Sequence, residues 1–307
     1  MHERRAMRPL VNMAVLGLPT LTAVWPWLWH DTFTRLQGYL DFHRHHDFHP
    51  TYYFAHIYTN PPAPWHFPPV MQAITTPLPL VALIAVGLGV SVAAAVRRWP
   101  GDGLPLLLAL NALVPAFVTA LPSTPTYDNT RLFLATSVFL AAFAGLGYAR
   151  IVAWLGGGAP RAVAVAALAL GLSLAGWARV RPYTLSYYGL LVGGPRGALS
   201  AGMESTYWGE ACNMAVVTWL NANIPDGSSL DTNSETYGTL AEYQRLGMLK
   251  PTLRFAAHAD YWVLTAQQGY SSFAEWWQLY EDRDPAYRTL ESWGLPGVRL
   301  VWVVERR

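Results

Sequence analysis

"QAITTPLPLVALIAVGLGVSVAAAV", residues 72–96, contains no charged side chain. At about 1.5 Å per residue, a helix of this length is sufficient to cross the hydrocarbon core of a membrane, which is about 30 Å thick. Only 13% of the 307 residues are charged, about half the usual fraction in a soluble domain. The sequence therefore predicts a polytopic α-helical membrane protein with about five transmembrane helices, the others near 9–29, 104–121, 132–149 and 162–178.

The arginines next to these apolar stretches predict how the helices are oriented. If each stretch crosses the membrane once, the flanking arginines all fall on one side, which the positive-inside rule makes cytoplasmic. The opposite side then receives the loop 30–71, the loop 122–130 and everything after about residue 180. We therefore expect a multi-pass protein of the inner (cytoplasmic) membrane. The arginines are Arg4, Arg5, Arg8, Arg97, Arg98, Arg150 and Arg161.

The C-terminal part of the chain has a different composition. From residue 181 onward, 13 acidic residues outnumber 10 basic ones, and the apolar runs become shorter. The patterns there predict helices alternating with short strands, which is typical of a small α/β domain. We expect a transmembrane region over 1–179 and an extracytoplasmic α/β domain over 180–307, with helices near 207–223, 235–247 and 271–283 and strands at 261–265 and 298–304.

Several classes of partner and site are disfavoured by composition alone. The single cysteine, Cys212, excludes a disulfide within the chain and a metal site made of several cysteines. The formal net charge of +2 argues against a nucleic-acid partner. The sequence contains no glycine-rich phosphate loop of the nucleotide-binding type. No cofactor is therefore expected.

The loop 30–71 is rich in histidine, which raises the question of a metal site. His45 and His49 are one helical turn apart and could bind zinc together with Asp41 or Asp47. However, the helical pattern of 31–44 ends shortly before Pro50, and the residue before a proline favours an extended conformation. A histidine-rich segment is also common in amphipathic stretches at a membrane surface. We therefore expect an interfacial loop without a metal.

The segment "YDNTRLF", residues 127–133, contains the most informative single residue. Arg131 immediately precedes an expected span, at the depth of the outer-leaflet phosphates. A guanidinium can bind a phosphate through two parallel hydrogen bonds, and Tyr127 and Asp128 lie next to it in sequence. The alternative is an arginine that extends toward the lipid headgroups and marks the end of the helix.

Five segments of the chain together resemble the later half of polytopic glycosyltransferases of the GT-C superfamily. They are "WPWLWHDTFTRLQGYLDFHRHHDFHPTYYFAHIYTNPPAPWHFPPV" (25–70), "TTPLPL" (75–80), "YDNTRLFLATSVFLAAFAGLG" (127–147), "RPYTLSYYGLLVGG" (181–194) and "YWGEA" (207–211). The most similar group is family 39, which includes proteins that resemble dolichyl-phosphate-mannose–protein mannosyltransferases.

The resemblance implies an activity and a set of ligands. Such hexosyltransferase-type enzymes pass a sugar from a polyprenyl-phosphate carrier to an acceptor on the extracytoplasmic face, so the partners would be membrane lipid and a lipid-linked sugar. It also implies that Arg131 and Tyr127 contact the carrier phosphate. The residues expected to line the wall around carrier and acceptor are Tyr52, Tyr53, His56, Trp65 and His66.

One feature of the family is not visible in this sequence. Its catalytic carboxylate lies in an early outer loop, upstream of the region that the resemblance covers. We expect that a preceding segment or partner polypeptide supplies this group, or that Asp47 or Asp128 acts as the base within this chain. The alternative is a non-catalytic membrane protein whose outer α/β domain binds a glycan or a partner protein.

Overall fold

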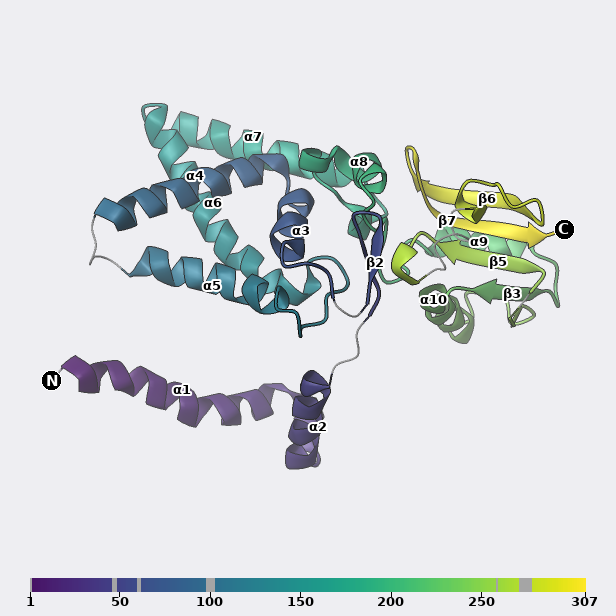
Figure 1. Cartoon of the computed structure of the whole chain (residues 1–307), viewed down its shortest axis with the longest axis horizontal. Helices are drawn as coiled ribbons and strands as arrows, with labels where there is room; N and C mark the ends of the chain where they lie inside the picture. The colour runs from purple at the N-terminus through teal and green to yellow at the C-terminus, as the bar shows by residue number, and fades with distance from the viewer. Residues whose placement is uncertain (1, 46–48, 60–61, 98–102, 258, 271–277) are drawn as a thin grey trace. The chain divides into compact units, whose positions relative to one another are not determined.

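The computed structural model describes residues 2–45, 49–59, 62–97, 103–257, 259–270 and 278–307. The chain forms two compact units, 1–47 and 48–307. In the first unit, the α-helix of the span predicted over 9–29 ends at Val24, because Trp25, which precedes Pro26, has a non-helical backbone with φ −115° and ψ 89°. The helix predicted over 31–44 is confirmed. This unit contains α1 (His2–Val24), a 3-10 helix (Pro26–Trp29) and α2 (Thr32–Arg44) (Figure 1).

The second unit begins with a β-hairpin that the sequence did not predict. β1 (Thr51–Tyr53) pairs antiparallel with β2 (His56–Tyr58) through a tight turn in which Phe54 and Ala55 both have positive φ. Non-glycine residues rarely adopt this conformation. The Ala55 amide donates to the Gly202 carbonyl at 2.9 Å, and a Cβ on Gly202 would lie 2.1 Å from the Ala55 nitrogen. A distant contact therefore stabilises the turn.

Apolar helices make up the next part of the second unit. Among the described residues, three helices are long and apolar enough to cross a membrane: Leu78–Arg97, Arg131–Trp154 and Ala159–Ala178. The chain is therefore helical, with three apolar helices of membrane-spanning length, and carries a small sheet domain. The helices are α3 (Phe67–Thr75), α4 (Leu78–Arg97), α5 (Leu104–Thr119), α6 (Leu134–Trp154) and α7 (Ala159–Ala178), and a 3-10 helix (Arg131–Phe133) precedes α6.

The continuous span predicted over 72–96 is wrong at its start. Thr76 is extended, with φ −91° and ψ 135°, because it precedes Pro77 and the proline ring disfavours the helical conformation there. Residues 72–75 therefore belong to α3, and α4 begins at Leu78. The end of α3 and the start of α4 therefore lie next to each other, on either side of Thr76 and Pro77.

Helices α4 to α7 run alternately in opposite directions from one to the next along the chain (Figure 1). Consequently the end of α4, the start of α5, the end of α6 and the start of α7 lie at one end of the group. Arg97 of α4, Arg150 of α6 and Arg161 of α7 lie in or near the parts of the helices at this end. The opposite end carries α3, the loop 120–133 and the connection to the sheet domain.

The C-terminal part of the second unit contains a mixed sheet with strand order β4-β3-β5-β7-β6. β3 runs parallel to β4 and β5, whereas β7 runs antiparallel to β5 and β6. The strands predicted at 261–265 and 298–304 are confirmed. The elements are α8 (Gly194–Ser200), α9 (Met214–Asn223), β3 (Ser229–Thr232), α10 (Ser234–Arg245), β4 (Arg254–Phe255), β5 (Tyr261–Thr265), β6 (Tyr287–Leu295) and β7 (Val298–Arg306).

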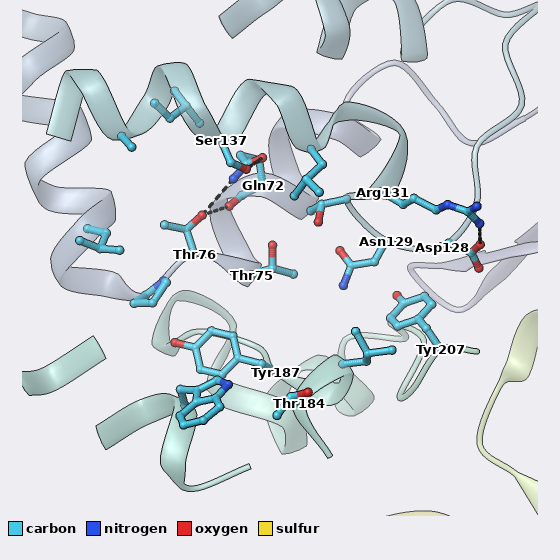
Figure 2. Close-up of a pocket in the computed structure, with 18 of the residues that line it drawn as sticks. Gln72, Thr75, Thr76, Asp128, Asn129, Arg131, Ser137, Thr184, Tyr187 and Tyr207 are labelled. Atoms are coloured by element: carbon cyan, nitrogen blue, oxygen red, sulfur yellow. Dashed lines mark hydrogen bonds and ion pairs between the residues drawn. The ribbon is translucent and has the colours of Figure 1, made fainter. Parts of the chain in front are cut away.

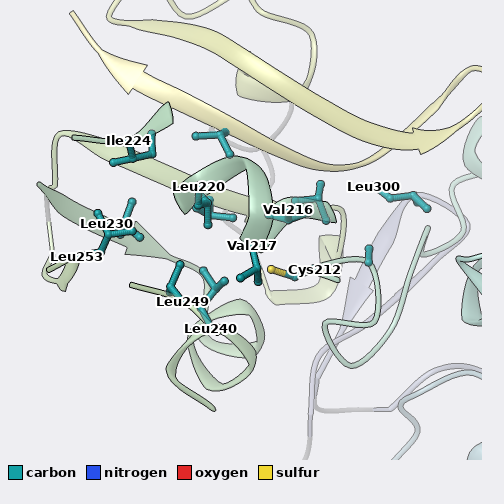
Figure 3. Close-up of a cluster of buried hydrophobic side chains, with 14 of the residues drawn as sticks. Cys212, Val216, Val217, Leu220, Ile224, Leu230, Leu240, Leu249, Leu253 and Leu300 are labelled. Atoms are coloured by element: carbon teal, nitrogen blue, oxygen red, sulfur yellow. The ribbon is translucent and has the colours of Figure 1, made fainter. Parts of the chain in front are cut away.

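Helix α9 supplies much of the core of this sheet domain. Val216, Val217 and Leu220 are fully buried and pack with Leu230 of β3 and Leu240 of α10 (Figure 3). The thiol of Cys212 belongs to the same core.

Helix α10 ends at Arg245, and Gly247, two residues later, has a left-handed φ of +72°. The predicted stop at Gly247 is therefore confirmed.

Two of the predicted helices differ from the structure. The helix predicted over 207–223 begins only at Met214, because Trp208 and Gly209 have left-handed φ angles that cannot continue a helix. Asn213 then caps α9 by accepting a hydrogen bond from the Ala215 amide at 2.9 Å. Part of the helix predicted over 271–283, namely 271–277, lies outside the described residues, and at its other end Asp282 has a left-handed φ of 56°.

Candidate functional site

A cavity of about 770 Å³ lies in the second unit, where α3, α4 and α6 meet the loops that follow α7. Segments far apart in the sequence contribute to it. Its wall comprises residues from 72–84, 128–144, 177–187 and 207–208. Four of the five segments on which the family resemblance is based, 75–80, 127–147, 181–194 and 207–211, therefore meet at one place.

One side of the cavity is apolar. It is formed by Leu80 and Ile84 of α4, Leu140 and Ala144 of α6, and Trp177 of α7. The spacing of the α6 residues places them on one face of the helix. Because these helices are of membrane-spanning type, this side of the cavity suits a hydrocarbon chain.

A neutral polar group lies between the apolar side and the charged rim. Ser137 of α6 donates to the Gln72 side-chain oxygen at 3.2 Å, and the Gln72 amide donates to the Thr76 hydroxyl at 3.2 Å. Figure 2 shows these three side chains linked on one side of the cavity. Polar groups on apolar helices are costly unless they are paired or functional, and these bond to one another from two different helices.

The rim carries an ion pair between Arg131 and Asp128. Arg131 Nη1 lies 3.0 Å from Asp128 Oδ2, and the arginine side chain is 53% exposed whereas the aspartate side chain is only 10% exposed. The guanidinium carbon lies 5.1 Å from the ring centre of Trp208 and 5.8 Å from that of Tyr127, within cation–π range. Of the charged residues that the structure describes, these two line the cavity.

The loop that holds this ion pair is anchored to the hairpin segment. The Thr126 carbonyl accepts a hydrogen bond from the Thr51 hydroxyl, and the Thr126 hydroxyl accepts one from the Ala63 amide at 2.9 Å. Asp128 and Asn129 then adopt left-handed φ angles of 54° and 59°, a conformation that these two residue types tolerate better than most. The loop therefore presents its side chains in a fixed geometry.

Glu210 shapes the wall on the other side of the cavity. Its carboxylate accepts hydrogen bonds from the Thr184 amide at 3.0 Å, the Thr184 hydroxyl at 2.6 Å and the Leu185 amide at 2.7 Å. Gly189, further along the same segment, donates from its amide to the Ile74 carbonyl of α3 at 2.6 Å. These contacts connect the segments 181–194 and 207–211 to the helix that carries Gln72.

Tyr207 closes the cavity toward the sheet domain. Its hydroxyl lies 3.1 Å from that of Tyr188, which in turn donates to the Glu204 carbonyl oxygen at 2.7 Å. Since Tyr188 donates to the carbonyl, Tyr207 is the donor between the two hydroxyls. Burial raises the pKa of both tyrosines above the ordinary value. Both hydroxyls therefore stay protonated at neutral pH.

The described part of the loop 30–71 contributes no residue to the lining of this cavity, although five of its residues were predicted to line the wall around carrier and acceptor. Tyr53 is fully buried, packs in a core with Phe67, and its hydroxyl lies 2.8 Å from His66 Nδ1. Tyr52 is also buried, whereas His56 and Trp65 are exposed. The structure thus brings Tyr53 and His66 together, but these residues are not among those that line the cavity.

The histidine group shows no arrangement suited to a metal among the described residues, where no cluster of three or more potential metal ligands occurs. His45 ends α2, and its Nδ1 lies 3.2 Å from the Asp41 carbonyl oxygen. His49 stacks edge-on against Tyr127, with ring centres 4.9 Å apart. Asp47, a candidate base from the sequence, lies outside the described residues.

Sequence reasoning missed several residues that shape the cavity: Gln72, Thr76, Ser137, Thr184, Tyr207 and Glu210. Polar residues within or beside an otherwise apolar stretch were the available signal for the first three. The last three lie in segments that the family resemblance includes but whose roles depend on tertiary contacts.

No family model matches this chain, and neither a curated protein nor a solved structure matches it.

Proposed function

We propose that this chain is a membrane glycosyltransferase of the GT-C superfamily, family 39-like, or the C-terminal part of one, and that its cavity holds a polyprenyl-phosphate carrier. The sugar would pass from this carrier to an acceptor on the extracytoplasmic face. The observation that supports the proposal is the convergence of 75–80, 127–147, 181–194 and 207–211 on one cavity. Those segments were singled out for a resemblance to lipid-linked sugar transferases.

The chemistry of the cavity fits the two parts of such a carrier. The apolar side between α4, α6 and α7 suits an isoprenoid chain. Arg131 at the rim suits a phosphate, because its guanidinium offers parallel N–H donors. Gln72, Thr76 and Ser137 offer neutral hydrogen-bonding groups in between. An amphiphile with one phosphate therefore matches the cavity better than a soluble nucleotide sugar.

We further infer that α5 and the apolar part of α1 lie in the membrane, giving about five spans. The Thr136 hydroxyl of α6 donates to the Ala112 carbonyl of α5 at 2.9 Å, so α5 lies at the depth of α6. On its other side Leu110, Leu113 and Phe117 are exposed, which suits contact with lipid. The arginine-bearing ends would face the cytoplasm and the cavity the outside.

The proposed transfer breaks the bond between the sugar C1 and a phosphate oxygen and forms a bond from C1 to the acceptor oxygen. The acceptor proton passes to a carboxylate, and the carrier leaves as its phosphate. Asp128 is the carboxylate of this chain that lines the described cavity. The alternative sources of the base are Asp47, a preceding segment and a partner polypeptide.

A second candidate function is binding without catalysis, in which the outer α/β domain recognises a glycan or a partner protein. The observation that favours it is the ion pair of Asp128 with Arg131 at 3.0 Å. A carboxylate that is bound to a guanidinium of its own chain can hold that guanidinium in place without taking part in proton transfer. Binding of a glycan or a partner protein by the α/β domain, without sugar transfer, would support this candidate.

The experiment that tests the proposal measures binding of a short-chain polyprenyl phosphate to purified protein in detergent. Arg131→Lys keeps the charge but loses the two-pronged geometry, so we expect affinity to fall roughly 10- to 150-fold. Arg131→Ala should cost at least as much. Arg150→Ala is the matched control, because Arg150 lies near the other end of α6 and its guanidinium also lies 5.1 Å from a tryptophan ring. Equal affinities for wild type and both Arg131 variants would refute the proposal.

A further inference from the structure

The Arg131–Asp128 pair gives the rim of the cavity one positive and one negative charge. Asp128 is the more buried partner, and its carboxylate is held 3.0 Å from the guanidinium. A ligand phosphate that reaches Arg131 must therefore come close to a carboxylate of this chain. The charge of the ligand then decides how strongly that carboxylate opposes binding.

In the proposed function the carrier occurs in two forms, the donor and the spent carrier, and these differ in charge. The inference drawn from this difference rests on the proposed function. A glycosyl phosphodiester, the donor, carries one negative charge, whereas the phosphate monoester left after transfer carries about −1.5 to −2 at pH 7. Repulsion by Asp128 is thus stronger for the product than for the donor.

We propose that Asp128 is a specificity-determining residue that makes the Arg131 site favour the glycosyl phosphodiester over the phosphate monoester. A like charge built into a site discriminates against the ligand that it repels more strongly, and specificity commonly uses such repulsion alongside attraction. The site would consequently bind the donor and release the spent carrier. The Asp128 carboxylate can also accept a hydrogen bond from a sugar hydroxyl while Oδ2 accepts from Arg131, because each carboxylate offers several acceptor positions.

The local structure anchors the backbone of the loop that carries this carboxylate. Asp128 and Asn129 are in consecutive left-handed conformations, and Thr126 fixes the start of the loop through Thr51 and Ala63. The Asn129 side-chain oxygen is buried and has no hydrogen-bond partner in the described part of the chain. The Asp128 charge therefore has a defined position at the rim.

The test compares three ligands that share one short prenyl chain, measured near pH 8: the prenyl phosphate, its methyl phosphodiester and its hexosyl phosphodiester. For wild type we expect both diesters to bind about tenfold more tightly than the monoester. Asp128→Asn should reduce this ratio to one or below, mainly by strengthening monoester binding, because the remaining Arg131 charge attracts the more highly charged monoester. Asparagine tolerates the left-handed φ at this position. Asp31→Asn is the matched control, since Asp31 also has a left-handed φ but lies in the first unit.

Each outcome separates this inference from the proposed function. If all three lipids bind in an Arg131-dependent way and Asp128→Asn leaves their ratio unchanged, the role of Asp128 is wrong and the carrier site stands. If Asp128→Asn weakens all three lipids equally, Asp128 only holds Arg131 in place, and the inference is likewise overturned. If wild type binds none of the lipids, the proposed function itself fails.

Discussion

Gly87 and Gly147 face each other where α4 crosses α6, and neither position has room for a side chain. A Cβ on Gly87 would lie 1.8 Å from the Phe143 carbonyl oxygen, and one on Gly147 would lie 1.9 Å from the Leu83 carbonyl oxygen. Small residues allow membrane helices to approach closely. The cavity begins about one turn away, at Ile84 of α4. The glycine contact therefore sets the separation of the helices that form its apolar side.

Alanine at either glycine should force the two helices apart. We expect Gly87→Ala and Gly147→Ala each to destabilise the protein by about 1–3 kcal/mol, the usual cost of overpacking. Thermal unfolding in detergent measures this effect. Gly89→Ala is the control, because a Cβ on Gly89, also in α4, would meet no atom of the described residues within 4 Å. A similar loss of stability in all three variants would show that the crossing is not tightly packed.

The predicted orientation can be tested by labelling single cysteines in intact cells. The native Cys212 is only 1% exposed, so it contributes little background. Cysteines introduced at Ser123 and Ser228 should react with a membrane-impermeant maleimide from outside. A cysteine at Ala159, at the arginine-bearing end of the helices, should react only after the cells are permeabilised. The reverse pattern would invert the topology.

The three hydrogen bonds that Glu210 accepts should make this residue important for the cavity wall. Glu210→Ala leaves two part-buried backbone amides and a part-buried hydroxyl without their acceptor, and each unsatisfied group costs up to about 1–3 kcal/mol. We expect a clear drop in thermal stability, together with weaker carrier binding. Glu242→Ala is the comparison, since Glu242 forms an exposed pair with Arg245, and solvent screens such surface pairs so that they contribute little to stability. Equal effects would contradict a specific role for Glu210.

Two buried acids should make the protein sensitive to alkali. Burial raises the pKa of the Tyr53 hydroxyl to about 12 and that of the Cys212 thiol to about 12, from ordinary values of 10.0 and 9.0. Because the folded state favours the protonated forms, their stabilising contribution is complete below about pH 9 and falls as pH rises toward 12. Cys212→Ala should therefore lose less stability than wild type as the pH rises above 9. Unfolding midpoints measured at several pH values test this difference, and parallel curves would count against it.

Local composition was sufficient to predict the apolar helices and parts of the sheet domain. The charge-free stretches form helices because their backbone groups must be paired wherever no water can reach them. The strand at 261–265 and the stop at Gly247 were also predicted, because β-branched residues and glycine act through local conformation. These features depend on a residue and its near neighbours in the sequence.

Which residues line the cavity is determined only by the tertiary structure. Gln72 meets Ser137, and Glu210 meets Thr184, through contacts between residues that are 65 and 26 positions apart. Local patterns carry no information about such pairs, and residues 207–213 even suggested a helix where Trp208 and Gly209 turn the chain instead. The sequence by itself determined the apolar helices of membrane-spanning length and indicated Arg131. The fold decided that this arginine shares a cavity with α3, α4 and the turn at Tyr207, since only packing over long sequence distances positions those groups.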